Sequence, residues 1–513
     1  MSQERNRSEL VSYNRAKLWQ ILFFAMNNTS TNIYLAAFSF VTYFATGILG
    51  LAAIFISQLM GYIRIFDGFI DPAIGIIIDK TETKFGKYRP ILVLGNLITA
   101  LSFVFLFNLD HFGEGMRMPL FLVALIIHKI GYSMQQTITK AGQTALTSDP
   151  KQRPVFNIID GIMTTVLMTG FQVIVAQVLI PKYGNFTPEF FNVLITWVIS
   201  ISAVLAVIAI IGIWAKDRKE FFGLGEKTKK TPLKDYFKVI KGNKPLQVLS
   251  ISAALVKFLA QLFGDSVVTV MLFGILFGNY ALSGTFSLLM ILPGVLITVF
   301  FSTIARKKGL RYSYVKALQV GILGLIALTA ILFVAKPGIL SLQKINLFTV
   351  GFIISYIFAR YATSAPSSLV LTMGADISDY ETSVSGRYVS GMIGTIFSLT
   401  DSIASSFAPM VVGWVIAAIG FTKEYPSVET ALTGDLKFAT IALIGIIPLV
   451  ASIISLTLMK FYKLDREEMV MIQEKIHVMK AARDKERAMD IAKNVPLSDM
   501  EYVDLAKYPV DEK

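Results

Sequence analysis

The chain has 513 residues, of which 54% are hydrophobic and 16% are charged, and its mean hydropathy is +0.61. A soluble protein would carry about 25% charged residues, so the composition excludes a soluble domain with a single anchor. The net charge of +13 does not indicate nucleic-acid binding, because the basic residues lie in short loops between apolar segments. No cysteine is present, which excludes disulfides and thiolate metal sites, and we expect no cofactor.

Continuous apolar runs predict helices that cross a membrane, each about 20–30 residues long. Loops rich in lysine and arginine alternate with loops that contain few, and the basic set is expected in the cytoplasm. The sequence therefore predicts an all-α protein of the plasma membrane, with both termini in the cytoplasm. We expect twelve spans, near residues 19–46, 51–79, 90–109, 119–146, 155–180, 190–215, 247–277, 281–304, 312–335, 343–373, 386–420 and 434–461.

The longest basic loop divides these spans six and six. The segment from Lys216 to Lys244 contains ten lysines and arginines and four acidic residues. Two membrane halves of six helices are typical of a secondary transporter that binds its solute near the midplane. We expect an N-terminal bundle over 1–215, a basic cytoplasmic linker over 216–246, a C-terminal bundle over 247–461 and a cytoplasmic tail over 462–513.

The second predicted span carries two acidic residues, Asp67 and Asp71, which share one face of a helix because they are four residues apart. A carboxylate at mid-membrane costs about 2.5–3.5 kcal/mol on insertion scales, so the pair requires a partner. We expect a mobile cation to be that partner. A fixed ion pair with Arg64, one turn before Asp67, is the alternative.

Two further motifs follow in loops. After the second span the chain has Gly75, then Asp79-Lys80, then Lys84, and then Gly86-Lys87-Tyr88-Arg89-Pro90. Gly75 permits close helix approach, and Asp79 can pair with the loop cations. In the second half, Ala375-Asp376-Ile377-Ser378-Asp379-Tyr380-Glu381 is followed by Gly386-Arg387.

The segment from Arg64 to Pro90 resembles helix II and the following loop of the glycoside–pentoside–hexuronide cation symporters. The motif from Ala375 to Arg387 resembles the helix X–XI loop of the same family, which belongs to the major facilitator superfamily. The resemblance implies the major facilitator fold and uptake of a sugar or glycoside by alternating access, coupled to a proton or sodium. It implies that Asp67 and Asp71 bind the cation. Sodium-coupled members often have an asparagine where this chain has Ile70, so proton coupling is favoured.

The resemblance also implies a cytoplasmic gate that closes in the outward-facing state. We expect it to contain Gly75, Asp79, Lys84, Gly86, Lys87, Arg89, Arg153, Asp376 and Arg387.

The solute site departs from the family pattern. Where the family has an acid in helix IV, this chain reads Gln135-Gln136-Thr137-Ile138-Thr139-Lys140, and the family's helix V arginine and helix XI lysine fall near Asp160 and Asp401. Lys140 and Asp160 are a candidate interhelical pair of reversed polarity, and Lys257 and Asp265, about two turns apart, are a candidate pore-lining pair. We expect the solute to contact Asn28, Asn32, Arg64, Gln136, Lys140, Asp160, Asp265, Arg360 and Asp401.

Pro366 lies in the tenth span, shortly after Arg360, and should break the helix, with neighbouring serines satisfying the freed backbone groups. The break is either a tolerated kink or the place of a hinge or ligand. A lipid-like or anionic solute is the alternative to a sugar, and a membrane enzyme or sensor is a more remote one. No nucleophile–base or metal-ligand constellation is evident in the spans, so we do not expect an enzyme. The expected partners are a small solute and the lipid bilayer, without nucleic acid or an obligate protein partner.

Overall fold

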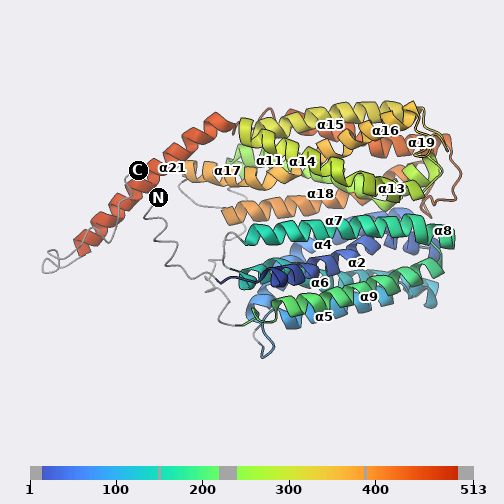
Figure 1. The fold of residues 1–513 in the computed structure, drawn as a ribbon, viewed down its shortest axis with the longest axis horizontal. Helices are drawn as coiled ribbons and strands as arrows, with labels where there is room; N and C mark the ends of the chain where they lie inside the picture. The colour runs from blue at the N-terminus through green and yellow to red at the C-terminus, as the bar shows by residue number, and fades with distance from the viewer. Residues whose placement is uncertain (1–13, 82, 148–151, 219–239, 386–389, 495–513) are drawn as a thin grey trace.

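The computed structural model describes residues 14–81, 83–147, 152–218, 240–385 and 390–494. These residues form two helical bundles that lie side by side (Figure 1), which we call the N half and the C half. The N half consists of α2 (Leu18–Phe38), α3 (Val41–Tyr43), η1 (Phe44–Ile48), α4 (Ala53–Lys80), α5 (Arg89–Leu106), η2 (Leu109–His111), α6 (Glu114–Leu146), α7 (Arg153–Ile174), η3 (Val175–Leu179), α8 (Ile180–Tyr183) and α9 (Pro188–Ile213).

The C half follows the basic linker and begins at α11. It consists of α11 (Lys244–Gly264), α12 (Ser266–Thr269), η5 (Val270–Leu276), α13 (Ala281–Leu289), α14 (Ile291–Lys308), α15 (Leu310–Phe333), α16 (Leu347–Ile357), η6 (Phe358–Ala362), α17 (Ser367–Ser385), α18 (Ser390–Ala418), α19 (Gly434–Ile441), η7 (Ala442–Ile446) and α20 (Ile447–Leu458). A last helix, α21 (Arg466–Asn494), projects from one end of the bundle (Figure 1).

Within the described residues, ten helical segments are long and apolar enough to cross a membrane. This confirms the prediction of an all-α, multi-pass membrane protein. The helices α2 and α4 occupy the first two predicted spans but fall outside this set, so the count of twelve stays a prediction. In α2 the reason is a polar run from Asn27 to Asn32, most of which is buried.

The polar run of α2 is held by hydrogen bonds to other helices of the N half. Ser30 Oγ donates to the carbonyl of Ser202 at 2.8 Å, and Asn96 Nδ2 donates to Ser202 Oγ at 2.8 Å. Asn27 Nδ2 donates to Thr139 Oγ1 at 2.8 Å. Interhelical bonds of this kind satisfy polar groups that lipid could not, which explains how α2 tolerates its composition.

Several helices begin where a side chain caps the first turn. Thr187, Asn243, Asn346 and Thr433 accept hydrogen bonds from the backbone N–H three residues later, at the starts of α9, α11, α16 and α19. Such caps each contribute about 1 kcal/mol. The seventh predicted span, expected as one helix over 247–277, is instead interrupted after Gly264, and the chain continues through α12 and the wider π turns of η5.

The two halves pack together at one end of the bundle, which we call the far end. There the ring of Tyr43 stacks on Phe186 at 4.2 Å and lies 6.0 Å from Tyr425 of the C half. Tyr425 Oη donates to the carbonyl of Ala53 at 3.0 Å, and burial raises the pKa of this phenol above its usual value. A single hydrophobic cluster at this end contains residues of both halves, including Phe40, Phe273 and Tyr425.

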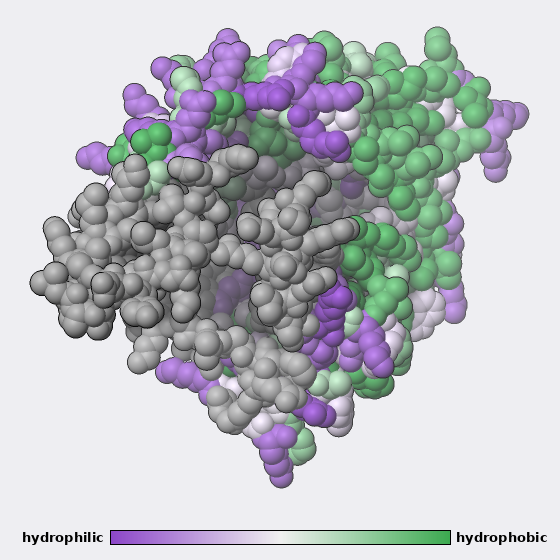
Figure 2. Space-filling model, turned by 60° about the vertical axis from the view of Figure 1, so that its left-hand side comes forward, coloured by the Kyte–Doolittle hydropathy of each residue, from purple (hydrophilic) through white to green (hydrophobic). Residues whose placement is uncertain are grey.

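The opposite end, which we call the linker end, is organised differently. Each half has a hydrophobic cluster of its own there, one around Phe24 and Tyr88 and another around Tyr314 and Met373. Figure 2 shows this end, where hydrophilic residues gather around a hollow while hydrophobic residues cover the side wall. Among the described residues, one hydrophobic cluster thus joins the halves at the far end, whereas the clusters at the linker end each belong to a single half.

Candidate transport site between the two halves

The carboxylate of Asp71 lies on α4 and accepts a hydrogen bond from Ser133 Oγ of α6. Asp71 is exposed rather than enclosed by packing. In the described part of the chain it forms no ion pair with Arg64, whose Nη1 instead donates to Gln261 Oε1 at 3.0 Å and to the carbonyl of Ser405 at 2.9 Å. Arg64 therefore reaches into the C half. For Asp71, the alternative of a fixed pair with Arg64 does not hold.

A second polar group connects α2, α6 and α7. Asn28 Nδ2 donates to Asp160 Oδ2 at 2.9 Å, and Gln136 Nε2 donates to Asn28 Oδ1 at 3.2 Å. Asn32, one turn after Asn28, donates to Thr164 at 3.4 Å. The structure thus confirms that the two asparagines share a face, directed at α7.

Lys140 is placed differently from its prediction. Its side chain is exposed, and within the described residues it forms no ion pair with Asp160. The expected Lys140–Asp160 pair is therefore wrong. The uncharged amide of Asn28 donates to Oδ2 of Asp160 instead, and the buried Oδ1 of Asp160 has no hydrogen-bond partner among the described residues.

In the C half, Lys257 of α11 pairs with Asp401 of α18, with 3.0 Å between Nζ and Oδ2. The side chains are 36% and 49% exposed, so the pair remains accessible from the space around it. The two residues of the candidate pore-lining pair, Lys257 and Asp265, therefore have different partners. Asp265 Oδ1 accepts from the N–H groups of Val267 and Val268, at 2.9 and 3.4 Å, and so caps α12 at the interruption of the seventh span.

The tenth span breaks as its proline predicts, with α17 beginning directly after Pro366. Ser364 Oγ and Ser368 Oγ donate to the carbonyls of Arg360 and Ala365, at 2.7 and 2.8 Å, and so satisfy freed backbone groups. Arg360 lies in the wide turn η6, just before the break.

Arg360 has tyrosines as neighbours. Its Nη1 donates to Tyr356 Oη at 2.9 Å, and the guanidinium lies 5.9 and 6.0 Å from the ring centroids of Tyr356 and Tyr361. No described carboxylate forms an ion pair with it. Its positive charge is therefore compensated by ring faces and a hydroxyl but by no described counter-charge.

Arg360 and these tyrosines line a cavity of about 570 Å³ between the halves. α7 contributes polar groups from the N half, and α13, α14 and η6 contribute the facing wall. The polar lining includes Thr165, Thr169, Gln172, Ser283, Ser287 and Thr298, among phenylalanine and aliphatic side chains. The cavity is large enough for a small solute.

The predicted gate residues Gly86, Lys87 and Arg89 lie in a loop that is held within the N half. The buried carboxylate of Asp217 accepts from the backbone N–H groups of Lys87, Tyr88 and Arg89, at 2.8 to 3.2 Å, and from Arg89 Nε at 3.2 Å. Gly86 has a φ of +103°, and a Cβ there would collide with this carboxylate. The loop therefore requires both Gly86 and Asp217.

Of the other predicted gate residues, the structure describes Gly75, Lys84 and Asp376, and it places none of these three in an ion pair or hydrogen bond with the opposite half. A Cβ at Gly75 would meet nothing within 4 Å, so the expected close helix approach is not made. Lys84 is exposed beside the ring of Phe85. Asp376 lines a cavity beside α21 within the C half. The side chains of Asp67, Asp79 and Arg153, and all of Arg387, lie outside what the structure describes.

Sequence reasoning missed three partners in this site: Ser133, Gln261 and Asp217. Ser133 and Gln261 are ordinary polar residues of apolar spans, and their partners come from helices distant in sequence. Asp217 lies in the basic linker, and no sequence pattern distinguished it from the charged residues around it, which are expected to contact water. Asp401 was expected to contact solute, but its pairing with Lys257 was not anticipated.

Comparison with known proteins agrees with this architecture. The model of the family described as MFS/sugar transport protein matches residues 21–466. An uncharacterized symporter of Bacillus subtilis, YnaJ, is 24% identical over 448 residues, covering 85% of this chain and 89% of that protein. The isoprimeverose transporter of Lactiplantibacillus pentosus is 25% identical over 439 residues, covering 85% of this chain and 86% of that protein.

Among solved structures, the nucleoside transporter NupG superposes with a TM-score of 0.61 at 13% identity. The superposition covers 87% of this chain and 100% of that one, which shows a shared fold. The family match confirms the resemblance found in the two loop motifs and identifies a transporter rather than an enzyme. The chain belongs to the MFS/sugar transport protein family.

Proposed function

We propose that this protein is a proton-coupled symporter that moves a sugar or glycoside across the plasma membrane by alternating access. In this proposal the linker end faces the cytoplasm, with both termini on that side. The structure then corresponds to a state that is closed outside and open inside.

The observation that carries the proposal is the asymmetry between the two ends. The far end is sealed by contacts between the halves, such as the hydrogen bond from Gln172 Nε2 to Ser283 Oγ at 3.0 Å. At the linker end the hydrophobic clusters belong to separate halves. Between the ends, polar groups of both halves face one another, as in the bond from Arg64 to Gln261. A solute site between two bundles that rock against each other has this form.

The chemistry of the polar groups supports a hydroxyl-rich solute. Asn28, Gln136 and Asp160 combine amide donors and acceptors with a carboxylate acceptor, a set suited to sugar hydroxyls. The similarity to an isoprimeverose transporter supports the same class.

The surroundings of Asp71 support a proton as the coupling ion. Its described partner is the single hydroxyl of Ser133, and the adjacent Ile70 is buried and supplies no side-chain oxygen. A hard metal cation takes several oxygen ligands, whereas a proton needs one carboxylate.

The proposal can be tested with the purified chain in proteoliposomes that contain a pH-sensitive dye. Adding isoprimeverose, lactose or methyl glycosides in turn to vesicles without an ion gradient should alkalinise the medium when the transported solute is present. Uptake that follows an imposed sodium gradient, without any pH change, would assign sodium instead. Failure of every glycoside under both gradients would refute sugar symport.

One observation favours a second candidate, an anionic solute. Arg360 lines the cavity between the halves and forms no ion pair with a described carboxylate, so an acidic group on the solute could supply the counter-charge. Competition between methyl glucoside and methyl glucuronide would separate the candidates. If the solute is anionic, Arg360→Gln should lose the preference for the glucuronide, whereas Arg306→Gln, outside this cavity, should keep it.

A further inference from the structure

We propose that a cavity at the junction of α15, α20 and α21 binds the headgroup of an anionic phospholipid. The cavity has a volume of about 570 Å³ and lies at the linker end of the C half, apart from the transport site. We call it the junction cavity. Its walls come from the first turns of α15, the end of α20 and the start of α21, including Arg311, Tyr312, Lys460 and Arg466.

The junction cavity has an excess of positive charge. Four basic residues line it, Lys308, Arg311, Lys460 and Arg466, against two acidic residues, Asp465 and Glu467.

Two of the four cations are already engaged. Arg311 Nη1 lies 3.8 Å from Asp465 Oδ2, and Arg466 Nη1 donates to the carbonyl of Lys307 at 2.8 Å. Lys308 and Lys460 are exposed and form no ion pair with a described carboxylate. Their two ammonium groups can therefore meet a phosphate without breaking an existing ion pair.

The cavity is amphipathic along the axis of the bundle. Val315 and Leu456 form an apolar wall, and they belong to segments that are apolar enough to cross the membrane, Leu310–Phe333 and Gly434–Leu458. The basic residues Lys308, Arg311 and Lys460 lie at or next to the ends of these two segments. Tyr312, 40% exposed, lies between Lys308 and Lys316, with 5.1 and 5.8 Å from the ammonium groups to its ring. Aromatic residues are enriched at this depth of a membrane.

A phosphate group is the chemistry that the cations recognise, and the apolar wall selects a lipid over free phosphate. A headgroup among Lys308 and Lys460 would place an acyl chain along Val315 and Leu456. Basic pockets between membrane helices bind anionic headgroups in this manner.

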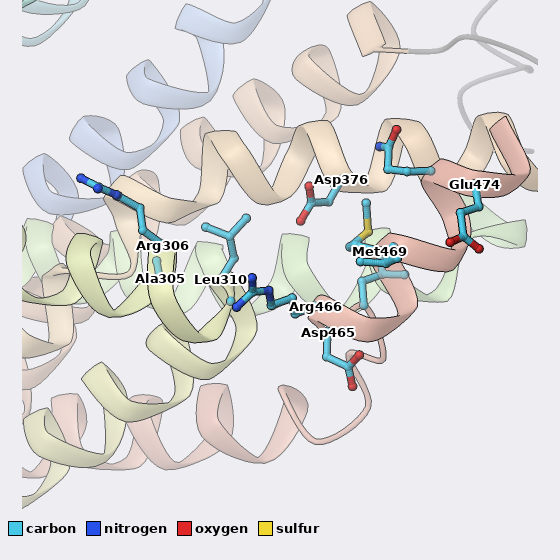
Figure 3. Close-up of a pocket in the computed structure, with 12 residues that line it drawn as sticks. Ala305, Arg306, Leu310, Asp376, Asp465, Arg466, Met469 and Glu474 are labelled. Atoms are coloured by element: carbon cyan, nitrogen blue, oxygen red, sulfur yellow. The ribbon is translucent and has the colours of Figure 1, made fainter. Parts of the chain in front are cut away.

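The neighbouring cavity on the other side of Arg466 has a different character. It measures about 450 Å³ and is lined by the acids Asp376, Asp465 and Glu474 beside Arg306 and Arg466. Figure 3 shows this cavity, with Arg466 pointing from α21 toward Leu310. Its acids disfavour an anion, so we assign the lipid to the junction cavity alone.

The test uses the full chain in detergent, titrated with phosphatidylglycerol or phosphatidylcholine and examined by native mass spectrometry. The wild type should retain phosphatidylglycerol in preference to phosphatidylcholine. The double variant Lys308→Gln/Lys460→Gln should bind phosphatidylglycerol roughly 10-fold more weakly or worse, because each lysine near a membrane surface contributes to anionic lipid binding. Lys336→Gln/Lys344→Gln is the matched control, since it removes two exposed lysines at the far end.

Loss of preference in the junction variant and its retention in the control would support the proposal. Equal retention of phosphatidylglycerol by both variants, or equal retention of the two lipids by the wild type, would overturn it. Inorganic phosphate that displaces the lipid at similar concentration would assign the cavity to free phosphate and reject the lipid. All variants change exposed side chains, and a thermal unfolding curve for each confirms that it is folded.

Discussion

Lys257 and Asp401 form an ion pair between α11 and α18, with 3.0 Å between Nζ and Oδ2 and both side chains partly exposed. Such a pair contributes at most about 1 kcal/mol to stability, because water screens it. It is therefore better placed to meet a solute than to hold the helices together.

Asp401→Asn should lower solute uptake at least 10-fold while leaving the midpoint of thermal unfolding almost unchanged, because the screened pair contributes so little to stability. Uptake into proteoliposomes and unfolding in detergent measure the two effects. Asp435→Asn, an exposed acid at the far end, serves as the control. A large fall in stability with proportionate loss of uptake would indicate a structural role.

Asp71→Asn should abolish accumulation of solute against a gradient and preserve exchange of labelled for unlabelled solute. The substitution keeps the shape of the side chain and an acceptor for Ser133, but it removes the group that can gain and lose a proton. Counterflow and proton-driven uptake, measured on the same vesicles, separate the two activities. Normal accumulation by this variant would remove Asp71 from the coupling mechanism.

A disulfide across the far end should stop transport reversibly. A Cβ built at Gly284 lies 3.3 Å from the Cβ of Ala176 on the other half, close to the separation in disulfides, and the chain has no cysteine of its own. Oxidised Ala176→Cys/Gly284→Cys should be inactive because the far end can no longer open, and reduction should restore uptake. The single variants control for packing. Full activity of the cross-linked protein would contradict opening at this end.

Asp217→Ala should destabilise the protein by about 2–4 kcal/mol, because three backbone N–H groups and the guanidinium of Arg89 lose a buried acceptor. Chemical unfolding followed by circular dichroism measures the change. Asp217→Asn, which keeps one carbonyl oxygen, should cost less. A neutral effect of Asp217→Ala would show that the loop does not depend on this anchor.

The sequence alone was sufficient for features that depend on short-range patterns. Apolar runs predicted the spans, Pro366 predicted the break in the tenth span, and the four-residue spacing of Asn28 and Asn32 predicted that both share one helix face. These follow from helix geometry and from the need to satisfy backbone groups in lipid, which act within one helix.

Side-chain pairs between different helices could not be predicted from such short-range patterns. Lys257 and Asp265 are eight residues apart, about 12 Å along a helix, and the interruption after Gly264 turns Asp265 into a cap. Lys257 instead forms an ion pair with Asp401, which lies on a helix more than a hundred residues later in the chain. Asp217 acquires its role because the end of α9 lies beside the loop that precedes α5.

The sequence by itself determined a polytopic helical membrane protein in two halves, because the hydrophobicity of each segment and the cost of inserting it into lipid are local properties of the chain. Only the tertiary structure decided which end is sealed, which charges meet, and that Arg360 lines a cavity between the halves. Those features depend on how two separately packed bundles are set against each other. That arrangement has more than one state of similar energy in a transporter, so no single helix encodes it.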